Sequence, residues 1–451
     1  MKEQRSSFTG KIGFVLAAAG SAVGLGNIWR FPYLAAKYGG GIFLLVYLIL
    51  SVTLGFALVC AEIAIGRKTG QSPINAFKTL DKRFTFVGWL AAIIPAIILP
   101  YYSVIGGWVA KYFAVFVSGG MQKAATDGFF DAFITSSVEP IGWFLLFIGV
   151  TALIVLIGVE KGVEKVSKVM MPILVVLTLF IAIYTLFMPG AIQGLIYYVK
   201  PDFSHFSATT VLAAMGQLFY SMSIAMGIMI TYGSYMKKDI SIESSVKQIE
   251  LFDTGIAFLA GLMIVPAVFS FSNGDAAALN KGPGLMFATL PKVFRSMAGG
   301  TIVGTVFFMM VLLAALTSSI SLMETVVSVL RDKLGWGRKT SCFAVLGLSL
   351  LLGVPSSLGF GLWKNVSIAG LSILDMFDFF SNSVLMPITA ILTCVFVGWV
   401  IGTKTLTDEI VLGGKFKQQK MFEIIIKYVA PICILLILIS SVLDGLGIVK
   451  I

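Results

Sequence analysis

The chain has 451 residues, of which 58% are hydrophobic and only 12% are charged. A water-soluble protein of this length needs more charge to cover its surface, so the composition excludes a soluble domain and makes the bilayer the solvent. The net charge of +11 does not indicate a nucleic-acid partner, because the basic residues are spread over short loops instead of gathering on one face.

Apolar runs follow one another along the chain. Most runs are about 20 residues or longer, which is the length of a membrane-crossing helix and not of a barrel strand. We predict an all-α integral membrane protein in which residues 1–451 form one transmembrane domain. The eleven predicted spans are residues 11–37, 41–66, 84–118, 141–158, 163–187, 208–236, 243–272, 299–330, 340–354, 367–400 and 425–446, with a re-entrant or surface helix near 276–292.

Lysine and arginine are distributed unevenly among the loops. If the N-terminus lies in the cytoplasm, most of the 33 basic residues fall on cytoplasmic segments, as the positive-inside rule expects. We therefore predict a multi-pass protein of the plasma membrane with a cytoplasmic N-terminus.

Several charged residues stand within the predicted spans. A charge at the centre of the bilayer costs about 2.5–3.5 kcal/mol on insertion scales. Any one of them could be a buried structural pair or the end of a snorkelling side chain, but as a set they favour a substrate or ion pathway. They are Arg30, Glu62, Asp253, Glu324 and Asp378.

The first span contains three glycines in Ala-Gly-Ser-Ala-Val-Gly-Leu-Gly-Asn, residues 19–27. Gly20 and Gly24 have the spacing of a helix-packing face. Packing does not explain Gly26 and Asn27, which follow at once, so we predict that the helix is interrupted here.

The sixth span has a similar weak stretch of small and hydroxylated residues at 216–227. Weak helices at matching positions of two halves indicate an inverted repeat, here about 11–187 and about 208–400, with an extra helix at about 425–446. Broken helices expose amides that suit a carboxylate and carbonyls that suit Na⁺. In the eighth span, Thr317, Ser318 and Ser319 either bond back to the preceding turn or supply further oxygen ligands.

Together these residues resemble the neurotransmitter:sodium symporter family, which has the LeuT fold. The stretch Gly20-Ser-Ala-Val-Gly-Leu-Gly-Asn-Ile-Trp-Arg-Phe-Pro32 is its most specific part, and the resemblance extends from Arg5 to the tenth span. It implies a 5+5 inverted repeat with helices 1 and 6 broken, in an eleven-span member of a family that often has twelve.

The resemblance also implies two sodium sites. The first would use Ala22, Asn27, Ser221 and Asp253 with the substrate carboxylate, and the second Gly20, Val23, Ala314, Thr317 and Ser318. The family often has Asn where this chain has Asp253. Because that carboxylate supplies the negative charge that chloride provides in some relatives, we predict that chloride is not required.

For the substrate, the resemblance implies a mostly apolar pocket that suits a small hydrophobic L-amino acid. Its lining would be Ala22, Leu25, Gly26, Ile98, Tyr102, Tyr220, Ser223, Met226, Ser318 and Leu322. The amides of Leu25 and Gly26 and the Tyr102 hydroxyl would meet the carboxylate. Ala225 stands where glycine is common, and we expect its methyl group to limit the unwinding of the sixth span.

The resemblance implies two gates, which close when charged residues form ion pairs and open when those pairs separate. The outer gate would use Arg30, Asp378, Gln217 and the lid Tyr220, and the inner gate would use Arg5, Asp332 and Tyr235. Glu62 would hold the unwound backbone of spans 1 and 6. Gly162 and Pro172 bracket a stretch of span 5 that could unwind to admit water, although Pro172 could equally be a static kink.

The predicted function is sodium-coupled symport that imports the amino acid by alternating access, by a monomer or a homodimer. The alternatives are a substrate-gated channel or an amino-acid sensor on the same fold. No enzyme is predicted, because His205 is the only histidine and stands in an outer loop, which argues against a His-based or metal-based catalytic site.

Overall fold

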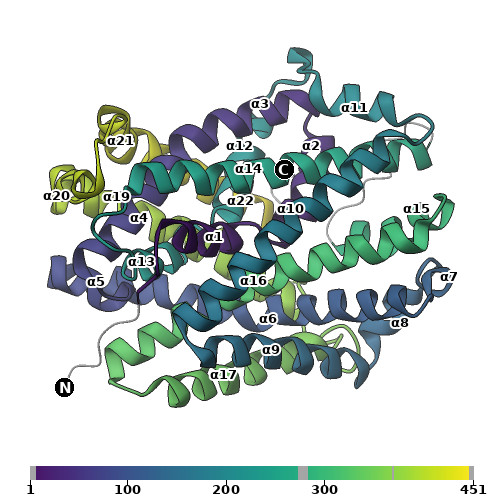
Figure 1. Cartoon of the computed structure of the whole chain (residues 1–451), viewed down its shortest axis with the longest axis horizontal. Coiled ribbons are helices and arrows are strands. Elements are labelled where there is room, and N and C mark those ends of the chain that lie inside the picture. The colour runs from purple at the N-terminus through teal and green to yellow at the C-terminus, as the bar shows by residue number, and fades with distance from the viewer. Residues whose placement is uncertain (1–6, 273–282, 368–369, 446–451) are drawn as a thin grey trace.

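The computed structural model describes residues 7–272, 283–367 and 370–445, which are helical and contain no β-strand (Figure 1). The helices of the first part are α1 (Lys11–Ala22), α2 (Phe31–Lys37), α3 (Gly41–Leu50), α4 (Phe56–Thr69), α5 (Pro73–Leu80), α6 (Thr85–Val117), α7 (Met121–Ala124), α8 (Phe129–Thr135), α9 (Glu139–Ile157), α10 (Lys165–Leu186) and α11 (Ala191–Val199). Those of the second part are α12 (Ala208–Ser221), α13 (Ile228–Gly233), α14 (Ile242–Phe271), α15 (Leu290–Ser296), α16 (Gly300–Leu334), α17 (Arg338–Leu358), α18 (Ile373–Asp378), α19 (Met386–Val395), α20 (Thr403–Ile410), α21 (Gln419–Ile424) and α22 (Ala430–Gly445).

Short wider turns of π-helix join several of these helices into longer rods. They are Gly26–Arg30, Ser51–Gly55, Val159–Glu164, Phe379–Leu385, Phe396–Val400 and Ile425–Val429, and a further one, Leu285–Thr289, precedes α15. Extra residues of this kind inside a helix often mark functional positions. Two of them lie beside the polar residues singled out above: Gly26–Arg30 follows the predicted break, and Phe379–Leu385 follows Asp378.

Nine helical rods in the described ranges are long and apolar enough to cross a membrane, or ten if the bent pair Lys11–Ala22 and Gly26–Lys37 counts as one span. The eleven-span count is not confirmed by this measure and stays a prediction. The missing span is 208–236, because the helix there is split into pieces of 14 and 6 residues, neither of which is long enough alone.

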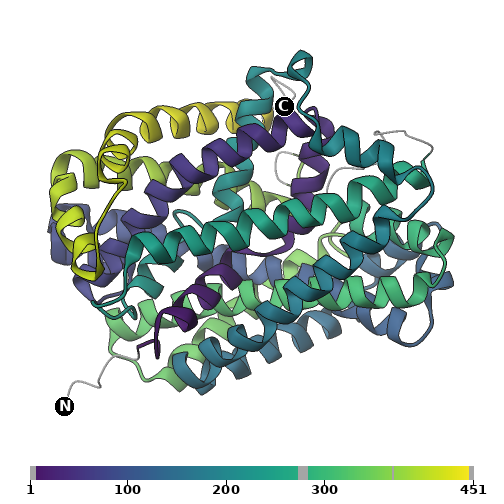
Figure 2. The same ribbon diagram turned by 45° about the horizontal axis from the view of Figure 1, so that its top comes forward.

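The longest helix, α16, forms the centre of the bundle. In its most apolar stretch 78% of the residues are buried, and it packs against α6, α9, α10 and α17. The short α1 lies in the middle of the molecule against α10, α14 and α16 (Figures 1 and 2). Outward-facing Leu153, Val176 and Ile183 are more than half exposed, as expected of a surface that faces lipid.

The predicted re-entrant or surface helix near 276–292 falls partly outside the described residues. Its remainder forms Leu285–Thr289 and the start of α15, and most of its side chains are buried. Phe287 packs against Trp29, Trp108 and Tyr112 on the interior side. The described part is therefore a packed element and does not lie on the surface.

Candidate functional site

The first helix is interrupted directly after Ala22. Val23 has an extended backbone (φ −72°, ψ 101°), and the two halves of the helix meet at 56°. The Asn27 side chain stabilises the break, because its Oδ1 accepts a hydrogen bond of 3.1 Å from the Gly24 amide. The interruption predicted from the glycines is thus present, and Asn27 is part of its structure.

The second interruption lies between α12 and α13. Ser223, Ala225 and Gly227 all have positive φ angles, of 53°, 63° and 68°. A left-handed non-glycine residue costs of order 1–3 kcal/mol and persists where its surroundings hold it in place. The helix is unwound at Ala225 nonetheless, since Ala225 itself adopts the left-handed conformation, and how far its methyl group limits unwinding stays a prediction.

Glu62 of α4 holds this second break. Its Oε1 accepts a hydrogen bond of 2.6 Å from the Ala225 amide. The other carboxylate oxygen, Oε2, is buried and has no hydrogen-bond partner among the described protein atoms. Glu62 therefore contacts the unwound backbone of span 6, and none of its hydrogen bonds in the described structure reaches span 1.

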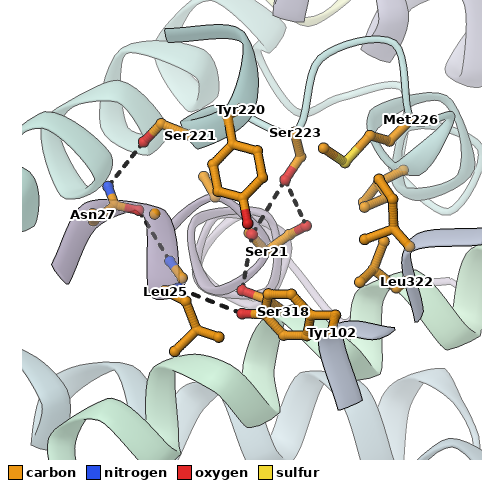
Figure 3. A pocket seen from close by; sticks show the side chains of 15 residues that line it. Ser21, Leu25, Asn27, Tyr102, Tyr220, Ser221, Ser223, Met226, Ser318 and Leu322 are labelled. Carbon is orange, nitrogen blue, oxygen red and sulfur yellow. Dashed lines mark hydrogen bonds between the residues drawn. The ribbon is translucent and has the colours of Figure 1, made fainter. Parts of the chain in front are cut away.

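A cavity lies between the two breaks, with an empty volume of about 390 Å³ that includes space open to the surroundings (Figure 3). All ten residues predicted to contact the substrate line it: Ala22, Leu25, Gly26, Ile98, Tyr102, Tyr220, Ser223, Met226, Ser318 and Leu322. Asn27 and Ser221, predicted as sodium ligands, line it too. Ser21, Gly24 and Ile228 complete the wall and were not among the predicted substrate contacts, although Gly24 was predicted at the break. Each of these three adjoins a predicted site residue or a break, which is the signal that could have found them.

Backbone and side chains of different helices converge in this cavity. The Leu25 amide lies 3.5 Å from the Tyr102 hydroxyl of α6, and the Ser21 and Ser223 hydroxyls are 3.2 Å apart (Figure 3). A Cβ added at Gly26 would stand 2.4 Å from the Tyr220 ring. Only glycine fits there, so the ring closes directly over the first break.

Asp253 of α14 supplies the carboxylate of a buried polar cluster behind the breaks. Its Oδ1 accepts hydrogen bonds from the Asn27 amide (2.8 Å) and the Ser221 hydroxyl (2.7 Å). Tyr47 of α3 donates to the Oδ2 at 3.2 Å. Tyr47 was not predicted, and the only signal for it is a hydroxyl group within an otherwise apolar run.

The three hydroxyls of Thr317, Ser318 and Ser319 have different partners. Thr317 bonds back to the carbonyls of Leu313 and Ala314, and Ser319 to that of Leu316. Ser318 instead turns across to the first break, where its Oγ lies 3.2–3.4 Å from three carbonyl oxygens, those of Gly20, Ser21 and Val23. Back-bonding to the preceding turn therefore holds for Thr317 and Ser319, whereas the alternative, that hydroxyls of this triplet supply oxygen ligands to a cation, stays a prediction.

The outer charged residues do not meet in this structure. The Arg30 guanidinium lies over the Tyr220 ring at 5.1 Å, and Asp378 accepts hydrogen bonds from Tyr101 (3.0 Å) and Asn382 (2.6 Å). No ion pair joins Arg30 to Asp378 in the described chain. Gln217, predicted to lie at the outer gate, donates a hydrogen bond from its Nε2 to the Gly26 carbonyl at 3.1 Å.

The start of the chain packs against Tyr235, one of the residues predicted for the inner gate. Phe8 is fully buried, its amide donates to the Tyr235 carbonyl at 3.1 Å, and its ring packs on Phe14, Tyr232 and Tyr235. The Tyr235 hydroxyl donates to Glu324 at 2.9 Å.

The other two residues predicted for the inner gate are Arg5 and Asp332. Arg5 lies outside the described residues, so the structure does not describe an Arg5–Asp332 pair. The Asp332 carboxylate accepts a hydrogen bond from the Ser72 amide at 2.7 Å.

The stretch between Gly162 and Pro172 is helical throughout, first as the wide turn Val159–Glu164 and then as α10. A Cβ at Gly162 would stand 2.2 Å from the Ile154 carbonyl oxygen. Close approach of α9 therefore accounts for this glycine in the present conformation. Pro172 is accommodated within α10.

Two interrupted helices around one central cavity in an all-helical membrane protein define a transporter of the LeuT fold. The chain belongs to the sodium:neurotransmitter symporter family, whose model matches residues 5–124 and 134–446. It is 34% identical to a sodium-dependent transporter of Bacillus subtilis, over 98% of this chain and 99% of that one. The same identity relates it to a sodium-dependent transporter of Haemophilus influenzae, over 97% and 98%.

Among solved structures, the crystal structure of MhsT in complex with L-phenylalanine matches with a TM-score of 0.88 and 38% identity, over 97% of this chain and 100% of that chain. A sodium- and chloride-dependent taurine transporter of Homo sapiens is 28% identical, over 90% of this chain and 73% of that one. These matches confirm the resemblance. The protein is a sodium-dependent membrane transporter and not an enzyme.

Proposed function

We propose that this transporter imports hydrophobic L-amino acids together with sodium. The observation that carries the proposal is the central cavity, which has unwound backbone and hydroxyl groups at one end and apolar side chains at the other. An amino acid has the same division between its polar backbone and its side chain. The phenylalanine bound to MhsT, a structural neighbour, supports the same class of substrate.

In this proposal the substrate carboxylate meets the amides of Leu25 and Gly26 and the hydroxyl of Tyr102. These amides begin the second half of the broken helix, where the helix dipole favours a negative charge. The amino group meets carbonyl oxygens near Ala22, Tyr220 and Ser223. The polar end of the cavity thus recognises what all α-amino acids share.

The side chain of the substrate lies among Ile98, Met226, Leu322 and the newly found Ile228, with Tyr102 and Tyr220 beside them. None of the residues that line the cavity carries a charge. A charged substrate side chain would have no counter-ion there, which disfavours it. Met226 is flexible and suits several apolar shapes.

Two sodium ions are proposed as co-substrates. The first would bind the Ala22 carbonyl, Asn27, Ser221, Asp253 and the substrate carboxylate. The second would bind the carbonyls of Gly20, Val23 and Ala314 with the hydroxyls of Thr317 and Ser318. The convergence of the Ser318 hydroxyl on two of these carbonyls supports the second set.

Chloride is not required in this proposal. The Asp253 carboxylate is fully buried and already places a fixed negative charge beside the first set of ligands. A sodium ion and the carboxylate of the substrate compensate one another there, and each raises the affinity of the other.

Transport would follow alternating access in the plasma membrane, with the N-terminus in the cytoplasm. The lysine-rich segments support this orientation, because α5, α20 and α21 lie together at one end of the molecule, and α7, α8, α11 and α15 lie at the other (Figure 1). Residues 11–187 and 208–400 would form the two repeats. Arg30 and Asp378 would close the outer side, and the segment at Phe8 with Tyr235 would open the inner side.

A sodium-gradient uptake assay tests the proposal. Purified protein in liposomes should accumulate a radiolabelled hydrophobic amino acid only under an inward sodium gradient, with other hydrophobic amino acids competing. Uptake that stops at equilibrium with the outside would indicate the channel alternative, and binding without uptake would indicate the sensor.

A further inference from the structure

A second cavity lies on the flank of the bundle, between α3 with its continuation Ser51–Gly55 and the facing side of α14. We call it the flank groove. Its empty volume, which includes space open to the surroundings, is about 1460 Å³, and its wall extends from Gly41 to Phe56. These sixteen residues of helix span about 24 Å, so the groove runs along most of the hydrocarbon core of a bilayer.

The flank groove opens toward lipid. Leu48, Val52, Leu251 and Phe258 line it and are themselves 37–73% exposed. Apolar side chains at this level of exposure on a membrane protein face acyl chains. A ligand therefore reaches the groove from the bilayer and not from water.

One end of the flank groove is polar, and it contains buried hydrogen-bond acceptors without a donor among the described protein atoms. Glu250 is only 6% exposed, and its Oε1 has no hydrogen-bond partner among the described protein atoms. Gln418 also lines the groove, and its side-chain oxygen is likewise buried without a hydrogen-bond partner among the described protein atoms. Buried acceptors without donors are costly, and an acidic residue within a membrane helix marks a site by default.

The missing partner is a hydrogen-bond donor, because both unpartnered atoms are acceptors. Lys247 stands one turn before Glu250 and lines the same end of the groove. Its ammonium group pairs with Glu243 at 2.6 Å, but its side chain is 45% exposed, which leaves donors for an anionic group. A positive group toward Glu250, a negative one toward Lys247 and a long apolar tail together describe a zwitterionic lipid.

We infer that the flank groove binds a phospholipid whose headgroup carries a primary ammonium group. The ammonium donates to Glu250 and Gln418, the phosphate accepts from Lys247, and an acyl chain lies along α3. A primary ammonium has three donors, whereas a quaternary ammonium has none, so the site distinguishes the two headgroups by hydrogen bonding.

This lipid would also bear on the central site. Tyr47 lines the flank groove, and its hydroxyl donates to Asp253 at 3.2 Å. Ser51 and Thr254, both in the groove wall, are joined by a hydrogen bond of 3.0 Å. A lipid in the groove would therefore contact both α3 and α14, whose packing positions Tyr47. Tyr47 in turn contacts Asp253, the carboxylate of the proposed sodium site.

Native mass spectrometry of the purified full-length protein tests the inference. The protein is exchanged into phosphatidylethanolamine, phosphatidylcholine or phosphatidylglycerol with identical acyl chains, and the retained lipid is counted. We expect phosphatidylethanolamine to be retained about tenfold better than phosphatidylcholine, the effect of one charge-assisted hydrogen bond. In Glu250→Gln, retention of phosphatidylethanolamine should fall toward that of phosphatidylcholine.

A matched pair of variants guards against a folding defect. Leu48→Trp fills the flank groove and should lower retention of all three lipids, whereas Leu153→Trp places the same side chain on exposed α9 and should not. Both should keep the melting temperature of the parent. Equal retention of phosphatidylethanolamine and phosphatidylcholine would overturn the inference. So would preferred retention of phosphatidylglycerol, or an unchanged preference in Glu250→Gln.

Discussion

The side-chain amide of Asn27 donates a hydrogen bond of 2.8 Å to the carboxylate of Asp253, and both residues are fully buried although 226 positions separate them. Asn27 also holds the first helix break through the Gly24 amide. A single side chain therefore connects the break to the acidic group of the proposed sodium site. Binding of a cation at Asp253 and of a substrate at the break would share this residue, which is a structural basis for coupling.

The first prediction concerns the charge of Asp253. Asp253→Asn should make uptake depend on chloride and weaken sodium activation in its absence by on the order of tenfold or more, because the fixed negative charge near the cation is lost. Uptake is measured in chloride and in gluconate. Asp202→Asn, at an exposed loop residue, is the control. Chloride-free transport that is unchanged in Asp253→Asn would refute the proposed role.

The second prediction separates two neighbouring hydroxyls. Ser318→Ala should raise the sodium concentration for half-maximal uptake about tenfold, because it removes the oxygen that faces the carbonyls of the first break. Ser319→Ala should leave sodium activation unchanged, since that hydroxyl bonds to Leu316 and Thr151. If both variants shifted sodium activation equally, the second sodium site would have to be placed elsewhere.

The third prediction concerns strain at Ala225. Ala225→Gly should raise the free energy of unfolding by about 1 kcal/mol, because glycine adopts a φ of 63° without the cost of a Cβ. Ala213→Gly, within α12, should have the opposite sign and lower it by about 1 kcal/mol. Thermal unfolding in detergent measures both. A loss of stability in Ala225→Gly would mean that the methyl group contributes packing that outweighs the strain.

The fourth prediction concerns space at the first break. Gly26→Ala should abolish or strongly impair substrate binding, because the new Cβ would stand 2.4 Å from the Tyr220 ring that closes over the cavity. Gly216→Ala provides the control, since a Cβ there meets no atom within 4 Å. Equilibrium binding of a labelled amino acid is the measurement. Normal binding by Gly26→Ala would show that Tyr220 moves away when the substrate enters.

Much of the fold was accessible from the chain alone. Runs of apolar residues of helix length predict the membrane bundle, because the bilayer leaves no other way to satisfy the backbone. The glycines before Asn27 predict the first break, because they weaken a helix wherever they stand. The ten predicted substrate contacts all line one cavity, which follows from the specificity of the motif between Gly20 and Pro32.

What the sequence determined by itself is therefore local: which segments are apolar helices, where the first helix is weak, and that an acidic residue, Asp253, stands within an apolar span. The tertiary structure alone decided what these groups meet. It placed Ser318 on the first break and Ser319 on α9, Tyr47 on Asp253, and Arg30 on Tyr220 instead of Asp378. It also put Ala225 in a left-handed conformation that its own preference opposes. The reason is that side-chain partners and strained backbone angles depend on helices distant in sequence, and their relative rotation is set by packing across the whole bundle.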